Sequence, residues 1–128
     1  MKRISSPRIT ELKTNEIFVF GSNSEGQHHG GAARLACQWG AVWGQGFGLA
    51  GQTYAIPTMS GYIDEIDSFV YEFVVFARSH PELKFLVTEI GCGIAGYTPE
   101  QIAPFFKRAI DMENIYLPQS FYDIIVKQ

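Results

Sequence analysis

Three glycine-bearing segments are the parts of this chain whose residue types favour ligand chemistry. They span residues 21–31, 39–51 and 91–97, and each lies where a strand-like apolar run meets another element. Glycine has no Cβ, so backbone N–H groups can turn towards an anion and a ligand can approach the chain closely. The segments therefore favour phosphate binding, while for each one alone a tight turn between packed elements is the alternative.

The third segment contains a formal dinucleotide-binding motif. Residues 91–96 read GCGIAG, which matches G-x-G-x-x-G, and Asp111 lies twenty residues after Gly91. However, the signal for the next helix comes at Thr98 and Pro99, after the last glycine, and only residues 97–128 follow the motif. This is too little chain for the rest of a dinucleotide half-fold, so we interpret the match as accidental.

Histidine and cysteine supply the remaining chemical groups. His28 and His29 are adjacent and point in different directions, so they are not expected to chelate one metal ion, and we predict neither a metal site nor a cofactor. Cys92 lies between two glycines ahead of a helix start, which can stabilise a thiolate, although a small buried residue is the alternative. Cys37 and Cys92 form no CxxC motif, which favours free thiols.

The composition is typical of one globular domain over residues 1–128. Hydrophobic residues make up 46% of the chain and charged residues 18%. A net charge of -3 with scattered Lys and Arg disfavours nucleic-acid binding. The N-terminus does not resemble a signal peptide and no apolar run is long enough to span a bilayer. We therefore expect a cytoplasmic protein without a membrane partner, and the sequence predicts no particular oligomeric state.

The elements that must position the glycine segments alternate between strands and helices. Apolar, β-rich runs predict strands at 9–12, 17–20, 53–58, 85–90 and 114–118, with 85–90 expected at the centre of the sheet. Periodicity and capping signals predict helices at 31–38, 64–79, from Thr98 onwards and at 120–127. This alternation predicts an α/β domain with helices on both faces of a mainly parallel sheet, which places ligands at the carboxyl ends of the strands.

Together, the three segments resemble the macrodomain family in order and spacing. Residues 9–23, ITELKTNEIFVFGSN, resemble the family's opening strand pair, which ends in an asparagine-containing loop. Residues 24–35 are similar to the glycine-rich loop and helix that close over the distal ribose. QGFGL at 45–49 resembles the segment ahead of the next strand, and GCGIAGY at 91–97 resembles the loop whose amides hold the diphosphate.

The resemblance implies a three-layer α/β/α sandwich with a mixed, mainly parallel sheet. It also implies a cleft that binds ADP-ribose or a related phosphorylated nucleoside. Amides near Gly30, Gly31 and 91–96 would hold the phosphates, Asn23 would orient a ribose hydroxyl, and Phe47 or Tyr97 would stack on ribose or base. The expected ligand-binding residues are Gly21, Ser22, Asn23, Gly30, Gly31, Gly46, Phe47, Gly91, Cys92, Gly93, Ile94, Ala95, Gly96 and Tyr97.

The chain also departs from the family's pattern. Pro7, Arg8 and Ile9 stand where the family commonly has an aspartate that reads the adenine amino group, which puts that route of base recognition in doubt. Ala33 corresponds approximately to the aspartate of a deacylating and de-ADP-ribosylating branch. The paired glutamates of a second branch have no counterpart, and Ala95 replaces a frequent aromatic. The family's catalysis is therefore not carried over.

Two other functions remain open. A hydrolase acting on an ADP-ribosyl or similar bond would use Asn23 to place water, with His28, His29 or Glu89 as the base. A protein-interaction domain with a vestigial cleft would instead present exposed aromatic residues, for which the sequence suggests Trp39, Trp43 and Phe121.

Overall fold

The computed structural model describes residues 2–23, 26, 31–59, 62–93 and 95–127. In this part of the chain, five strands form one sheet in the order β2-β3-β1-β4-β5. The strands are β1 (Glu16–Ser22), β2 (Gly48–Ala50), β3 (Thr53–Pro57), β4 (Lys84–Val87) and β5 (Ile115–Tyr116). All are parallel except β2, which pairs antiparallel with β3. The predicted α/β class and mainly parallel sheet are confirmed.

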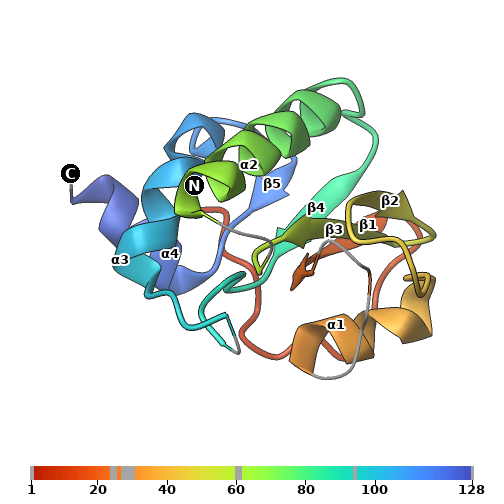
Figure 1. Cartoon of the computed structure of the whole chain (residues 1–128). Helices are drawn as coiled ribbons and strands as arrows, with labels where there is room; N and C mark the ends of the chain where they lie inside the picture. The colour runs from red at the N-terminus through yellow and green to blue at the C-terminus, as the bar shows by residue number, and fades with distance from the viewer. Residues whose placement is uncertain (1, 24–25, 27–30, 60–61, 94, 128) are drawn as a thin grey trace.

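Four α-helices accompany the sheet in the described part of the chain. They are α1 (Gly31–Ala36), α2 (Ile63–Arg78), α3 (Pro99–Ile102) and α4 (Gln119–Val126), with 3₁₀ segments at Cys37–Trp39 and Ala103–Ala109. Figure 1 shows α1 on one side of the sheet and α2 on the other. None of the helices described is both long enough and apolar enough to cross a membrane.

The start of α3 confirms the predicted capping box. The Thr98 side chain accepts a hydrogen bond from the backbone N–H of Gln101, and Gln101 Oε1 accepts one from the backbone N–H of Thr98 at 2.9 Å. Pro99 occupies the first turn, where its missing N–H costs nothing. The local sequence is therefore sufficient to locate this helix start, which follows the third glycine segment.

Alternation along β1 divides the core between the two faces of the sheet. Ile17 and Val19 join the larger cluster, which includes Phe73 of α2 and residues of α4 and the second 3₁₀ segment. Phe18 and Phe20 join a smaller cluster with Ala36 at the end of α1. Because successive strand residues point to opposite faces, the short run Ile17 to Phe20 can anchor helices on both sides.

The structure corrects several expectations about the sheet. β1 is the central strand, and β4 lies between β1 and β5. β4 ends at Val87, so residues 88–90 belong to the following loop. Continuous apolar runs predict burial on both faces, but they do not indicate which buried strand is central.

Two segments also differ from their predicted conformations. Residues 9–12 form no strand, and Ile9 and Leu12 instead pack against the smaller cluster. Within the second glycine segment, residues 48–50 form the edge strand β2, which the sequence had assigned to a loop. The Gln45 side-chain amide donates to the carbonyl oxygens of Phe47 and Leu49, at 3.3 and 2.9 Å, so part of this edge is already satisfied.

Two aromatic residues suggested for an interaction surface are not exposed as expected. Phe121 is fully buried and its ring lies 5.6 Å from that of Phe106. Trp39 is partly buried, with its ring 4.9 Å from Phe18, whereas Trp43 is 55% exposed. Phe121 therefore serves core packing and not contact with a partner protein.

Candidate functional site

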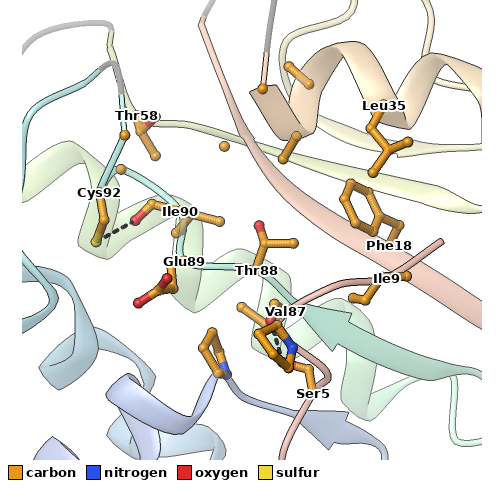
Figure 2. A pocket seen from close by; sticks show the side chains of 18 of the residues that line it. Ser5, Ile9, Phe18, Leu35, Thr58, Val87, Thr88, Glu89, Ile90 and Cys92 are labelled. Carbon is orange, nitrogen blue, oxygen red and sulfur yellow. Dashed lines mark hydrogen bonds between the residues drawn. The ribbon is translucent and has the colours of Figure 1, made fainter.

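A cavity of about 1270 Å³ lies at the carboxyl ends of β1, β3 and β4 (Figure 2). Its described walls come from the N-terminal segment 4–10, the segments that follow β1, β3 and β4, α1, and the beginning of α4. Ligand sites of parallel sheets form at this edge because the connecting loops converge there. The volume exceeds the roughly 300–1,000 Å³ typical of small-molecule pockets, so the cavity has room for a small-molecule ligand.

The first and third glycine segments meet at this cavity. Eight of the residues expected to bind a ligand line it: Gly21, Ser22, Asn23, Gly31, Gly91, Cys92, Gly93 and Ala95. Gly30 and Ile94, together with His28 and His29, lie outside the described residues. Two segments about seventy residues apart in the sequence thus meet at the edge of the sheet where the parallel strands end.

Close backbone packing holds the first and third glycine segments together at the cavity. A Cβ on Gly21 would lie 3.3 Å from the Gly91 backbone nitrogen and 3.2 Å from Thr58 Oγ1. Beyond β4, the backbone N–H and the hydroxyl of Thr88 both donate to the Val19 carbonyl, at 3.1 and 2.9 Å. These contacts extend the alignment of β4 with β1 past the end of the strand and position the loop that follows.

The second glycine segment supports the cavity from outside its lining. Gly46 is buried, and its carbonyl accepts a hydrogen bond from the hydroxyl of Ser22, a cavity residue. The Phe47 ring lies 5.0 Å from Phe69 of α2 and 6.1 Å from Tyr54, on the side of the larger cluster. Neither Gly46 nor Phe47 belongs to the described lining.

Tyr97 and Gly96 also lie outside the described lining of the cavity. The Tyr97 side chain packs against the larger cluster, and its backbone N–H donates to the Gly91 carbonyl at 2.8 Å. The two aromatic rings considered for stacking, Phe47 and Tyr97, are thus engaged in internal contacts. The apolar side chains that do line the pocket include Ile9, Phe18 and Leu35, which Figure 2 shows opposite Ile90 and Cys92.

Backbone donors of the third segment are available to a ligand. Among the described residues, no hydrogen-bond acceptor is found for the backbone N–H of Gly91 or of Gly93. Both residues line the cavity, and a Cβ on Gly93 would meet nothing within 4 Å. An unpaired amide at a cavity wall is a ready donor to an anionic oxygen.

Glu89 carries the negative charge of the cavity wall. Its Oε2 accepts a hydrogen bond of 2.6 Å from the Ser120 hydroxyl at the beginning of α4. Both residues line the cavity, as does Ser5, whose hydroxyl donates to the Val87 carbonyl at 2.7 Å. Sequence analysis missed Ser5 and Ser120, because no local motif marks two serines that only folding brings to the end of β4.

The environment of Cys92 disfavours a reactive thiolate. Burial, together with the smaller effects of the nearby Glu89 and Glu100 carboxylates, raises the pKa of the Cys92 thiol to about 11. The thiol lies 3.5 Å from the Ile90 carbonyl (Figure 2). The small, partly buried role is therefore favoured over the nucleophilic one, and both Cys37 and Cys92 are free thiols.

Comparisons with known proteins leave the cavity as the main guide to function. No match was found among family models, curated proteins or solved structures. The part of the chain that the structure describes also holds no group of three or more His, Cys, Asp or Glu residues able to bind a metal ion. The case for a ligand therefore depends on the shape and chemistry of this cavity.

Proposed function

We propose that this protein binds ADP-ribose or a related phosphorylated nucleoside in the cavity at the carboxyl ends of β1, β3 and β4. The observation that carries the proposal is the meeting of the first and third glycine segments at one cavity wall. There the Gly91 and Gly93 amides have no acceptor among the described residues. Phosphate oxygens are the ligand atoms that such backbone donors accommodate best.

The remaining walls suit the rest of a nucleotide. Ile9, Phe18 and Leu35 offer an apolar surface to a base or sugar, and Asn23 lines the cavity where it can orient a ribose hydroxyl. The placement of α1 and α2 on opposite sides of the sheet is also compatible with a three-layer, macrodomain-like α/β/α sandwich (Figure 1). Geometry and family resemblance thus support the same class of ligand.

Isothermal titration calorimetry with ADP-ribose, ADP and NAD tests the proposal. Gly93→Asp places a carboxylate at the wall where we expect the phosphates, in open space that leaves the fold unstrained. At about 4 Å, repulsion between two charges is worth roughly 1–4 kcal/mol, so we expect affinity to fall about tenfold or more. Thr14→Asp adds the same charge at an exposed turn outside the described lining and should leave affinity unchanged. Absence of binding by all three compounds and by GDP-ribose at millimolar concentration would refute the proposal.

The same samples separate binding from hydrolysis. Asn23 and Glu89, two of the candidate catalytic residues, both line the cavity. Incubation with an ADP-ribosylated protein should leave the modification intact if the protein only binds. Release of ADP-ribose by the wild type, lost in both Asn23→Ala and Glu89→Gln, would identify a hydrolase instead.

A further inference from the structure

The described lining of the cavity contains two charged residues, and they have opposite signs. Arg8 belongs to the N-terminal segment, and Glu89 to the loop that follows β4. The other described lining residues are apolar, glycine or neutral polar. Both residues are exposed, so their charged groups can meet a ligand at the mouth of the cavity, and charged groups favour ligands with complementary groups.

The Glu89 carboxylate and the Gly91 amide serve different parts of the cavity. Ser120 of α4 holds the carboxylate through the 2.6 Å hydrogen bond, and α4 follows β5, on one side of β4. The Gly91 nitrogen lies against Gly21 at the end of β1, on the other side of β4. The loop after β4 therefore places the Glu89 carboxylate, an acceptor, on the β5 side and the Gly91 backbone nitrogen, a donor, on the β1 side.

The N-terminal segment enters the cavity from the same β5 side. The Ser5 backbone N–H donates to the Leu117 carbonyl at 2.8 Å, and its hydroxyl donates to the Val87 carbonyl at 2.7 Å. This fixes the segment over the ends of β4 and β5, three residues before Arg8. Figure 2 shows Ser5 and Val87 at the opposite end of the pocket from Thr58. The β5 side thus combines the Glu89 carboxylate with the apolar Val87 and Pro118, and Arg8 lines the cavity three residues after Ser5.

This combination is unsuited to a phosphate and well suited to a particular purine. A carboxylate repels phosphate oxygens and accepts N–H groups, whereas a guanidinium donates to oxygen and nitrogen acceptors. Guanine carries two adjacent donors, N1–H and the N2 amino group, and two adjacent acceptors, O6 and N7, which arginine binds in bidentate fashion. Adenine instead places its unprotonated N1 beside its amino group, and a facing carboxylate repels that nitrogen.

We propose, on the basis of the proposed nucleotide-binding function, that the β5 side of the cavity selects guanine over adenine. Glu89 accepts from N1–H and the N2 amino group, Ser120 holds the Glu89 carboxylate in place, and Arg8 donates to O6 and N7. The phosphates then extend towards Gly91 and Gly93.

Calorimetric titration of the full chain with GDP-ribose and with ADP-ribose tests this selection. We expect GDP-ribose to bind about tenfold tighter or more, since a good bidentate contact discriminates between bases to that extent. Glu89→Gln should abolish the preference. The glutamine side chain has only one acceptor oxygen, and its NH₂ group would face a donor group of guanine. Glu82→Gln makes the same change at an exposed turn before β4, outside the described lining, and should retain the preference.

Ser120→Ala provides a second variant that leaves the charge intact. Without its 2.6 Å hydrogen bond the carboxylate is less well oriented, so the preference should decrease without disappearing. Equal or tighter binding of ADP-ribose by the wild type would overturn the guanine proposal and leave nucleotide binding standing. A guanine preference that survives in Glu89→Gln would overturn the role of Glu89. Failure of both compounds to bind would overturn the proposed function itself.

Discussion

Gly26 connects the first two glycine segments, and its replacement tests how tightly they pack. Its φ angle is +69°, and a Cβ at this position would lie 2.3 Å from the Gln45 backbone nitrogen and 2.5 Å from the Gly44 carbonyl carbon. The Gly44 N–H also donates to the Gly26 carbonyl at 3.1 Å. Both close atoms belong to the backbone, so Gly26→Ala requires one segment to move away from the other.

Two terms determine the expected loss of stability. A left-handed backbone costs a residue with a Cβ about 1–2 kcal/mol. Overpacking against atoms that cannot rotate away adds about 1–3 kcal/mol, for a total of about 2–5 kcal/mol. Gly31→Ala is the matched control, because Gly31 has a φ of +61° and nothing within 4 Å of its Cβ position. Gly31→Ala should therefore lose only the roughly 1–2 kcal/mol that a left-handed backbone costs.

Urea denaturation of both variants measures the difference. The entropy that alanine removes from the unfolded chain is common to both substitutions, so it cancels when the two free energies of unfolding are subtracted. We expect Gly26→Ala to be less stable than Gly31→Ala by about 1–3 kcal/mol. Equal losses would refute the close approach of the segments at Gly26.

Three further substitutions or treatments test other parts of the structure. Phe73→Ala removes a fully buried ring that contacts Tyr54 and Phe85. In urea titrations, it should lower the free energy of unfolding by about 3–5 kcal/mol. A loss below about 1 kcal/mol would contradict the placement of Phe73 in the core. Thr98→Ala removes the helix cap and should cost about 0.5–2 kcal/mol by the same method, whereas Thr98→Ser, which keeps the hydroxyl, should cost less. The raised pKa keeps the Cys92 thiol protonated at neutral pH. Alkylation of Cys92, followed by mass spectrometry, should therefore be slow at neutral pH and accelerate as the pH approaches about 11. Rapid alkylation at neutral pH would show that the thiolate is not suppressed.

Local patterns were sufficient for most elements. Helix α2 was predicted from residues 64–79 and observed at Ile63–Arg78, because its apolar residues repeat at helical spacing over four turns. Strand β3 was predicted at 53–58 and is observed at Thr53–Pro57, where proline has no N–H to donate to a neighbouring strand. By contrast, β2 has only three residues, and its strand character comes from pairing with β3 rather than from a pattern of its own.

The candidate site was partly predictable for a similar reason. Gly21 and Gly91 follow predicted parallel strands, so the carboxyl-end rule was enough to place them near one another. The directions of the Phe47 and Tyr97 side chains were not predictable, because an aromatic residue beside a loop can face a ligand or the core with equal ease. In this fold both rings join internal aromatic and apolar contacts.

The sequence by itself determined strands β1, β3, β4 and β5, the long helix α2, the capping box of α3 and the positions of the glycine segments. These depend on interactions between residues close together in the chain, and such interactions leave a periodic or motif-like signature. Only the tertiary structure decided that β1 is central and that Ser5, Glu89 and Ser120 meet at one end of β4. Their proximity arises from strand order and helix packing, which sum many weak contacts across the whole chain and leave no trace at any one position.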